Sequence, residues 1–404
     1  MSHSWFSDGS QISCLPDDAA TALLVGRLWM PGTGPVLVGV HRGQLRDLSD
    51  VSLTCSELLA QSDPAAVVRD ALRHAPVVAE LGAVLRNAPQ ASRRPDLPFL
   101  LAPCDLQVIK ASGVTFVASL LERVVEEQAR GDAGRAEGLR QELMAAMGGA
   151  LSEVRPGSAQ ARKIKDLLLA RGLWSQYLEV GIGPDAEIFT KAPVLSAVGT
   201  GDDVGLHPRS RWNNSEPEVV LAVSPEGRIV GAALGNDLNL RDFEGRSALL
   251  LGKAKDNNAS CAIGPFIRLM DDGFGLEDVR RCQINLRVQG PDGFELTDSG
   301  SMSLISRDPQ DLVQQAMGDH HQYPDGMMMF LGTMLAPTVD RLGAGSGFTH
   351  QEGDWVGISS ARLGTLVNRV QRSDRAPPWV FGIGSLMRSL ATRPRRSSNP
   401  RLPG

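Results

Sequence analysis

The chain has 404 residues, which is long enough for one large domain and a smaller one. Of these residues 42% are hydrophobic and 22% are charged, values that are typical of a globular protein. Its net charge of −5, from 41 basic and 46 acidic side chains, provides no basic surface field and so does not indicate a nucleic-acid partner. No apolar run reaches the roughly 18–20 residues that a membrane-spanning helix needs, so we expect no membrane association.

The N-terminal segment and the cysteines indicate where the protein works. Residues 1–18 contain three aspartates and lack the apolar stretch of a secretion signal. The five cysteines are scattered and include no CxxC pair, so we interpret them as reduced thiols and not as a disulfide framework or a zinc site. A cytoplasmic location is therefore expected.

The first part of the chain has mixed character. Residues 20–49 contain two strand-like apolar runs separated by Pro-Gly-Thr-Gly, and the periodicity then becomes helical. The polar, proline-rich stretch 87–98 is the best linker candidate. We therefore predict a small N-terminal α/β domain over residues 1–97 and a main domain over residues 98–373.

Within the main domain, the pattern changes from helical to β-rich. Residues 115–175 are predominantly helical in pattern, with a break near residues 131–134. From residue 179 to residue 372, short β-rich runs alternate with Gly and Pro turns, which predicts a β-rich core. The segment 374–404 holds arginines among prolines, and we expect it to wrap around the protein or to be partly disordered.

The clearest chemistry lies in a predicted hairpin. The strand-like runs EVVLAV and RIVGAALG flank Ser-Pro-Glu-Gly, which has Pro and Gly at the second and fourth positions of a β-turn. Glu216 and Glu218 are two residues apart, so their side chains leave the same face of the strand. In a hairpin centred near residue 226, position 216 lies opposite about position 236, which brings Asp237 beside the two glutamates.

Three clustered carboxylates repel one another unless a cation compensates their charge. All-oxygen ligation favours Mg²⁺, with Mn²⁺ or Ca²⁺ as alternatives, over zinc or copper. Pro217 cannot donate to a β-ladder, which predicts an edge or a bulge between the two glutamates. The alternative interpretation is a solvated strand with ordinary surface carboxylates, and the Glu-x-Glu spacing by itself does not decide between the two.

These residues resemble the fumarylacetoacetate hydrolase family, whose pattern is Glu-x-Glu, an aspartate in a Gly-Asn-Asp stretch, and a lysine shortly before Gly-Pro. The matching stretches are EPE (216–218), GNDLNLRD (235–242), GKAKDNNASCAIGPF (252–266), FLGTMLAP (330–337) and GDWVGISSARLGTLVNRV (353–370). Lys255 is the matching lysine, and the resemblance covers about residues 100–372.

The resemblance implies an α+β fold with a mixed β-roll core, a helical lid and a smaller N-terminal α/β domain. It also implies a divalent-metal site formed by Glu216, Glu218 and Asp237, a 2-oxo acid as the small-molecule partner, and assembly as a homodimer or homotetramer. No nucleic acid or membrane is implied.

One departure from the family pattern bears on the reaction. Hydrolases of the family carry His-x-x-Glu on a short helix, and the corresponding stretch here, residues 113–123, has Glu122 but Ser119 in place of the histidine. A serine hydroxyl cannot replace imidazole as a base near neutral pH. Hydrolysis of a C–C bond is therefore disfavoured.

Two further stretches, SMSLISRDPQDLV (301–313) and HHQYPDGMMMFLGTMLAPTVDR (320–341), resemble the 2-keto-3-deoxy-pentonate dehydratases within this family. The resemblance implies removal of water from 2-keto-3-deoxy-D-xylonate or a stereoisomer, through a metal-stabilised enolate, to give 2,5-dioxopentanoate. The implied catalytic residues are Glu122 for proton transfer, Lys255 for the developing charge, and Ser119. The implied substrate-binding residues are Thr333, Lys191, Arg307 and Ser306.

Two other functions stay open on the sequence. One is a C–C hydrolase or decarboxylase that acts on acylpyruvate-like 2-oxo acids with the same metal site. The other is a non-catalytic, metal-dependent protein that binds 2-oxo acids. Ser119 argues against the hydrolase, while Glu122 and Lys255 argue against loss of catalysis.

Overall fold

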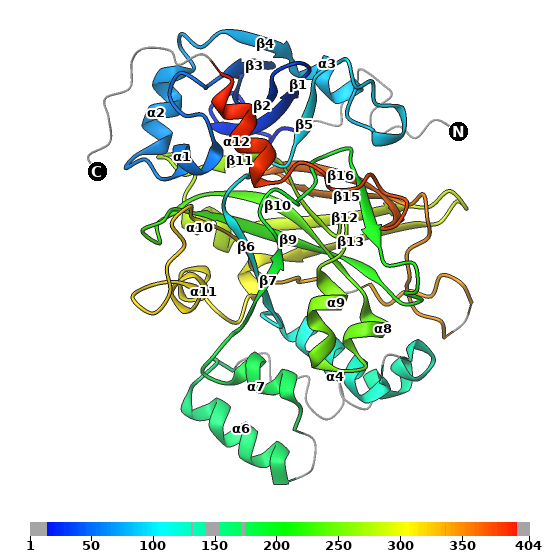
Figure 1. Cartoon of the computed structure of the whole chain (residues 1–404). Helices are drawn as coiled ribbons and strands as arrows, with labels where there is room; N and C mark the ends of the chain where they lie inside the picture. The colour runs from blue at the N-terminus through cyan, green and yellow to red at the C-terminus, as the bar shows by residue number, and fades with distance from the viewer. Residues whose placement is uncertain are drawn as a thin grey trace.

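The computed structural model shows a mixed α/β molecule with two stacked β-sheets (Figure 1). The residues that the structure describes are 14–130, 132–141, 154–170, 174–335, 337–343 and 345–393. Parts of the predicted N-terminal domain, helical segment and C-terminal tail thus lie outside the described residues. These are residues 1–13, 142–153, 171–173 and 394–404, besides single positions.

The larger sheet has 11 strands and the smaller has five. In spatial order, the larger sheet contains β4 (Val77–Glu80), β3 (Gln44–Asp47), β2 (Gly34–His41), β1 (Leu24–Met30), β11 (Cys261–Leu269), β10 (Ile229–Asn239), β9 (Asn214–Val223), β14 (Met327–Phe330), β6 (Val108–Gly113) and β7 (Glu187–Ala192), with β5 (Phe99–Leu101) paired to β1. The smaller sheet contains β13 (Glu295–Ser301), β12 (Gln283–Gln289), β15 (Trp355–Ser360), β16 (Gly364–Arg372) and β8 (Asp203–Leu206).

Helices lie at both ends of the larger sheet (Figure 1). Toward the N-terminal strands lie α1 (Cys55–Leu59), α2 (Pro64–Ala71), α3 (Leu81–Arg86), η1 (Gln90–Ser92) and α12 (Ile383–Ala391). Toward the opposite end lie α4 (Val117–Ala129), α6 (Ala159–Ala170), α7 (Gln176–Ile182), α8 (Arg241–Glu244), η2 (Ala248–Leu250) and α9 (Leu251–Lys255). The remaining helices are α10 (Leu276–Arg280), η3 (Met302–Leu304) and α11 (Pro309–Ala316).

The central strand β9 explains why the hairpin sequence is so apolar. All ten of its residues are buried. Val219 and Leu221 pack in a core shared with the smaller sheet, whereas Val220 and Ala222 pack in a second core that includes helices α1 and α2. A strand that is buried on both faces reads as a continuous apolar run and not as an alternating one.

The predicted hairpin is confirmed. β9 and β10 pair antiparallel, with Glu216 directly opposite Asp237 and Pro217 opposite Asn236. The connecting turn is closed by hydrogen bonds from Ser224 N to Arg228 O and from Gly227 N to Ser224 O. The register shifts along β10 between Ala232 and Leu234, where the strand meets β11.

The N-terminal segment does not form a sheet of its own. Strand β1 pairs antiparallel with β11, so the first strands extend the same sheet that holds the β9–β10 hairpin. Leu58 and Val68 share a hydrophobic core with Val220 and Ile263. The division at residues 97/98 therefore stays a prediction, and it falls inside one continuous sheet.

The C-terminal segment returns to the N-terminal strands, where α12 lies in Figure 1. Trp29 on β1 contacts Phe381 edge to face, with ring centroids 5.3 Å apart. Ser389 on α12 donates to the carbonyl of Thr33 at 3.2 Å. The described part of the predicted tail thus wraps over β1 and β2.

Gly235 on β10 marks how closely the hairpin is packed. A β-carbon at this position would collide with the ring of Phe330 on β14 and with the side chain of Val220 on β9. We expect Gly235→Ala to lower the free energy of unfolding by about 1–3 kcal/mol, because an overpacked core cannot relax without cost. Denaturant unfolding measures the change.

Gly275→Ala is the matched control, because a β-carbon there meets no atom within 4 Å. The control is expected to lower the unfolding free energy by no more than about 1 kcal/mol, because Gly275 is the N-cap of α10 and Ala is the poorer cap there. Equal losses in both variants would contradict the tight contact at Gly235.

Candidate active site

Three carboxylates converge where the β9–β10 hairpin meets β14. Oxygen atoms of Glu216, Glu218 and Asp237 lie within 4.8 Å of one another. All three side chains are buried, with exposed fractions of 4%, 1% and 1%. The hairpin register places Glu216 opposite Asp237, and the two-residue spacing puts Glu218 on the same face of the strand.

Cationic side chains hold two of the three carboxylates. Lys255, at the end of α9, pairs with Glu216 and lies 3.0 Å from Asp237 Oδ2. Lys191 Nζ lies 2.9 Å from Asp237 Oδ1, and Arg123 Nη2 lies 2.6 Å from Glu216 Oε1. Glu218 instead accepts the backbone N–H of Gly332 at 2.6 Å.

The electrostatic environment differs among these groups. Burial and the charges of Asp237 and Glu216 raise the pKa of Glu218 well above its usual value. Although burial raises the pKa of Asp237, Lys191 and Lys255 outweigh burial and lower it. Although burial lowers the pKa of Lys255, the charges of Asp237 and Glu216 hold it above its usual value. The ionised form of Asp237 is therefore stabilised, while no Lys, Arg or His among the described residues pairs with Glu218.

These groups line a small cavity with a volume of about 20 Å³. Its walls are formed by Ser112, Gly113, Val114, Ser119, Arg123, Glu187, Phe189, Glu216, Glu218, Asp237, Glu244, Lys255 and Thr333. The walls thus contain five carboxylates but only Arg123 and Lys255 as cations, and Lys191 directly behind them makes three.

A surplus of two negative charges therefore exists if all five carboxylates are ionised. The charged residues just outside the cavity wall do not remove this surplus. Glu122 and Glu126 pair with Arg140 and Arg241, so two negative charges meet two positive charges. A buried surplus of this size is costly unless it is neutralised. The donor set consists of hard oxygen atoms, and one divalent cation would compensate the charge, so the residues present fit Mg²⁺, Mn²⁺ or Ca²⁺.

Two acidic residues at the cavity escaped the sequence reasoning. Burial raises the pKa of Glu187, and burial raises the pKa of Glu244 to about 7. Glu244 lies 2.8 Å from Arg123, whereas none of the described residues hydrogen-bonds the carboxylate of Glu187. A signal for Glu187 was present, because on a strand residue 187 shares a face with Lys191.

Gly113 makes room for Glu187. The two residues are direct partners in the pairing of β6 with β7, and a β-carbon at Gly113 would overlap the carboxylate of Glu187. The side chain of Glu187 therefore lies across the backbone of Gly113, at the cavity wall.

The structure does not bring Glu122 to the cavity. Its carboxylate pairs with Arg140 and lies 2.7 Å from Arg241 Nη2. Although burial raises the pKa of Glu122, the two arginines outweigh burial and lower it. On helix α4, the side chains of Ser119 and Arg123, four residues apart, line the cavity. The side chain of Glu122 is not part of the cavity wall. A tightly paired anion is poorly suited to move a proton, so this geometry does not support the predicted role of Glu122.

Four other predicted site residues make hydrogen bonds within the protein. Ser119 lines the cavity and donates to Phe116 O at 2.9 Å. Thr333 also lines it, 2.9 Å from Leu335 O and 3.2 Å from Pro217 O. Lys191 donates to the carbonyl of Lys255, besides its contact with Asp237. Ser306 lies outside the described cavity wall and donates to Thr115 O at 2.8 Å.

Arg307 also lies away from the cavity. Its guanidinium donates to the carbonyls of Val180 and Gly183, at 2.9 and 2.8 Å, where α7 ends. The carbonyls at a helix C-terminus lack intrahelical partners, and a cation there satisfies them. The predicted substrate-binding role of Arg307 is therefore not supported, because its donors anchor α7.

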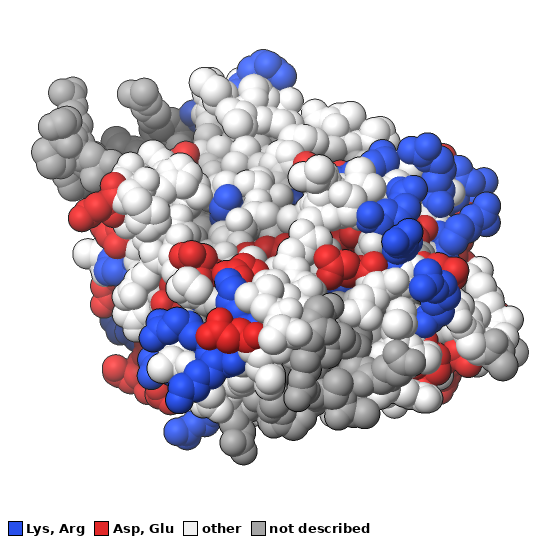
Figure 2. Space-filling model, turned by 90° about the horizontal axis from the view of Figure 1, so that it is seen from below, with Lys and Arg blue, Asp and Glu red and all other residues white. Residues whose placement is uncertain are grey.

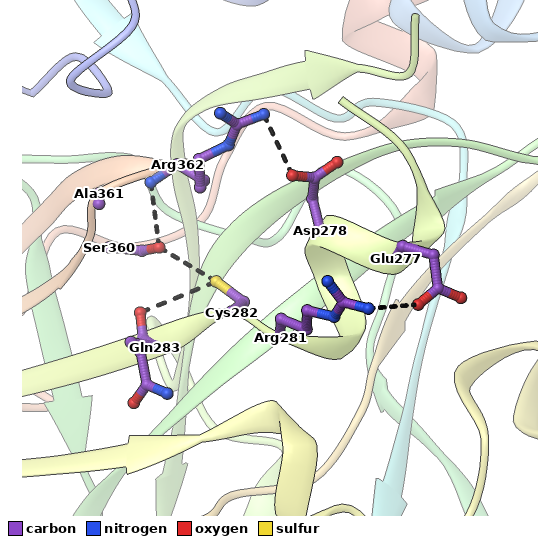
Figure 3. A pocket seen from close by; sticks show the side chains of 8 residues that line it. All are labelled: Glu277, Asp278, Arg281, Cys282, Gln283, Ser360, Ala361 and Arg362. Atoms are coloured by element: carbon purple, nitrogen blue, oxygen red, sulfur yellow. Dashed lines mark hydrogen bonds and ion pairs between the residues drawn. The ribbon is translucent and has the colours of Figure 1, made fainter. Parts of the chain in front are cut away.

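A larger hollow of about 430 Å³ lies elsewhere, beside α10 (Figure 3). Its charged side chains pair with one another, Arg281 with Glu277 and Arg362 with Asp278 (Figure 3). Burial raises the pKa of the Cys282 thiol, which makes it a poor nucleophile. This hollow therefore offers no comparable chemistry.

The surface around the lower helices carries charges of both signs. Figure 2, which views the molecule from below, shows acidic side chains across the middle of the face, with clusters of Lys and Arg on either side. This distribution matches the slightly negative net charge and shows no continuous basic surface on that face.

Comparisons with known proteins agree with this geometry. Residues 182–371 match the family model described as Fumarylacetoacetate (FAA) hydrolase C-terminal. A probable 2-keto-3-deoxyxylonate dehydratase of Haloferax volcanii is 30% identical over 194 residues, which is 48% of this chain and 63% of the relative. A 2-dehydro-3-deoxy-D-arabinonate dehydratase of Saccharolobus solfataricus is 27% identical over 186 residues, 46% of this chain and 59% of the relative. The chain thus matches less than two thirds of the length of these relatives.

Solved structures show the same fold. A 2-keto-3-deoxy-D-arabinonate dehydratase in its apo form has a TM-score of 0.59 at 18% identity, over 86% of this chain and 99% of that one. The form described as complexed with magnesium and 2,5-dioxopentanoate has the same TM-score, identity and coverage. A fumarylacetoacetate hydrolase from Exiguobacterium antarcticum has a TM-score of 0.54 at 17% identity, over 87% of this chain and 100% of that one. The predicted fold class is confirmed.

The charge surplus leads to a prediction about metal and stability. Magnesium at a hundredfold excess over its dissociation constant is expected to raise the free energy of unfolding by about 2.7 kcal/mol. In Glu218→Gln this increase is expected to vanish, because an uncharged amide is a weak ligand for a hard cation. Unfolding with magnesium and with EDTA measures both effects.

Glu226→Gln, in the exposed turn of the same hairpin, is the control and is expected to keep the full increase. A magnesium effect that survives in Glu218→Gln would place the ion elsewhere.

Proposed function

We propose that this chain, whose residues 182–371 match the Fumarylacetoacetate (FAA) hydrolase C-terminal family model, is a magnesium-dependent dehydratase. Its substrate is 2-keto-3-deoxy-D-xylonate or a pentonate stereoisomer of it, and its product is 2,5-dioxopentanoate. The observation that carries this proposal is the buried carboxylate trio, in a cavity where five carboxylates face only three cations. The names of the two curated relatives, both pentonate dehydratases, support the substrate class.

Glu216, Glu218 and Asp237 are the residues that hold the ion in this proposal. When bound, a divalent cation supplies Lewis-acid polarisation of a 2-oxo group and charge stabilisation where the oxygen becomes negative. Lys255 pairs with both Glu216 and Asp237, Lys191 pairs with Asp237, and these ion pairs fix the orientation of the two carboxylates. Neither lysine is free to act as a base while it remains paired with these carboxylates.

Dehydration needs a group that takes the proton from C3 and an acid for the hydroxyl that leaves C4. Glu187 is the better candidate for proton transfer than Glu122. It lines the cavity, and burial raises its pKa, so it can hold a proton closer to neutral pH than an ordinary carboxylate. The hydroxyls of Ser112, Ser119 and Thr333, which share the cavity wall, are the candidates for binding substrate oxygens.

Substrate entry requires the cavity to open. A volume of about 20 Å³ accommodates an ion or one water molecule but not a five-carbon acid. Helix α4 contributes Ser119 and Arg123 to the wall, and Arg123 bonds across the cavity to Glu216. An outward displacement of α4 would therefore enlarge the cavity, in keeping with the helical lid that the family resemblance implied.

The location and assembly of the protein follow as further proposals. No helix in the described part of the chain is long and apolar enough to cross a membrane. We infer a cytoplasmic enzyme that assembles as a homodimer or homotetramer. Trp379, Val380 and Met387 expose 47%, 80% and 66% of their surface beside α12, which supports association. Light scattering in solution tests this, and a monomer at working concentration would contradict it.

The reaction itself is the first test. Synthetic 2-keto-3-deoxypentonate is expected to yield a trappable aldehyde with magnesium, and none with EDTA. Acylpyruvate is expected to stay intact, because the Ser119 hydroxyl cannot serve as the base for hydrolysis. Cleavage of acylpyruvate would favour the C–C hydrolase, and inactivity on both compounds would favour a non-catalytic binding protein.

Proton transfer is tested by paired variants. Glu187→Gln is expected to lower kcat by roughly 10²–10⁴-fold, since an amide cannot exchange the proton. The affinity for magnesium, measured by calorimetry, should stay close to that of the wild type. Gly113→Ala, which displaces the carboxylate of Glu187, is expected to lower kcat in the same direction.

Glu122→Gln serves as the comparison, because it breaks ion pairs with Arg140 and Arg241 outside the cavity. It is expected to lower stability more than turnover. A loss of kcat in Glu122→Gln together with normal kcat in Glu187→Gln would return proton transfer to Glu122.

A further inference from the structure

The edge of β9 that faces β14 lacks a strand partner beside the metal ligands. In the described part of the chain, β14 pairs with β9 only over Val220–Val223. In an antiparallel strand, the N–H and C=O of one residue point to the same edge, and successive residues alternate between edges. Val219 accepts from Leu331 N at 3.1 Å on the β14 side, so Ser215 and Pro217 also direct their backbone groups to that edge.

Side chains take the place of the missing strand. Ser215 N donates to His350 Nε2 at 3.1 Å, and the Thr333 hydroxyl, which lies 2.9 Å from Leu335 O, also contacts Pro217 O at 3.2 Å. Pro217 has no N–H, so it leaves no unpaired donor at this edge. Ser215 and Pro217, the two neighbours of Glu216, are therefore held at this edge by the side chains of His350 and Thr333 and not by a strand.

His350 is held in the state that can accept this hydrogen bond. Its Nδ1 lies 2.9 Å from Asp354 Oδ2, and Asp354 also accepts from Arg341 Nη2 at 2.7 Å and from Gln351 N at 3.0 Å. A carboxylate accepts, so Nδ1 carries the proton and Nε2 presents its lone pair to Ser215 N–H. His350 and Asp354 are 5% and 0% exposed.

The same three residues have the connectivity of a hydrolytic triad, because Ser215 Oγ lies 3.0 Å from His350 Nε2. Two observations argue against nucleophilic catalysis. Ser215 is only 1% exposed, so no substrate reaches its hydroxyl. In addition, the lone pair of Nε2 that would take the serine proton already accepts the backbone N–H of Ser215. The arrangement therefore fixes the backbone instead of activating the hydroxyl.

We propose that His350, oriented by Asp354, is a positioning residue that fixes the β9 backbone at Ser215 and so aims Glu216 at the metal ion. This inference rests on the proposed magnesium site. Glu216 is the residue next to Ser215, and its carboxylate is drawn toward both Arg123 and Lys255. Magnesium demands near-ideal geometry, so a small shift of this strand end weakens binding.

The test is calorimetric titration of the full chain with magnesium. His350→Met keeps the approximate volume but removes the acceptor, and it is expected to raise the dissociation constant roughly 10–100-fold, as loss of an outer-shell partner does. His350→Gln, whose amide oxygen can accept from Ser215 N, is expected to stay within about threefold of the wild type, well short of that loss. Ser215→Ala keeps the backbone N–H and is expected to bind like the wild type.

Asp354→Asn provides a second route if His350→Met does not fold. Its amide can donate to Nδ1 and so place the proton on Nε2, and it is expected to weaken binding in the same direction as His350→Met. The electron spin resonance spectrum of bound Mn²⁺ should broaden in both weakened variants and match the wild type in His350→Gln.

Three outcomes separate the ideas. Magnesium affinity that is unchanged in His350→Met, or lost equally in His350→Gln, would overturn the positioning role while leaving the metal site intact. A loss in Ser215→Ala as large as in His350→Met would assign the effect to the hydroxyl and overturn the backbone argument. Absence of magnesium binding by the wild type would overturn the proposed function as well.

Discussion

The repulsion among buried carboxylates is the constraint around which this molecule is organised. Glu216, Glu218 and Asp237 are removed from water at the junction of two strands, in a cavity whose five carboxylates outnumber the three cations Arg123, Lys255 and Lys191. Burying uncompensated charge in a protein interior costs several kcal/mol per ion. Such a cluster is stable when a cation completes it, so the fold and the metal site are energetically one problem.

The scaffold holds these carboxylates in fixed positions. Strand β9 packs between two hydrophobic cores, which fixes its position, and the pairing with β10 fixes its register. Its free edge is closed by two side chains, and Glu218 is held by the backbone N–H of Gly332. Around this centre, α4 contributes Ser119 and Arg123 to the cavity wall, and Arg123 bonds Glu216 from outside the hairpin.

The sequence predicted what depends on local spacing. The hairpin and its approximate register follow from alternation along two strands and a four-residue turn, so Asp237 could be placed beside Glu216 and Glu218 without a structure. Lys255, by contrast, was identified by family resemblance alone. The fold class was recovered in the same way, from motifs and not from periodicity.

What depends on distant contacts was not predicted. Glu122 was assigned to the site by family resemblance, but its carboxylate pairs with Arg140 and Arg241 outside the cavity wall. Glu187 reaches the cavity through the pairing of β6 with β7, and the continuity of the N-terminal strands with the core depends on the pairing of β1 with β11. No local pattern encodes these strand neighbours.

The most direct measurement is anomalous diffraction from crystals of the protein soaked with Mn²⁺. We expect one strong peak per chain between the carboxylates of Glu216, Glu218 and Asp237, with an oxygen of each within bonding distance. A peak elsewhere would contradict the account. So would the absence of any peak at saturating metal, with the carboxylates still paired to Lys255 and Arg123.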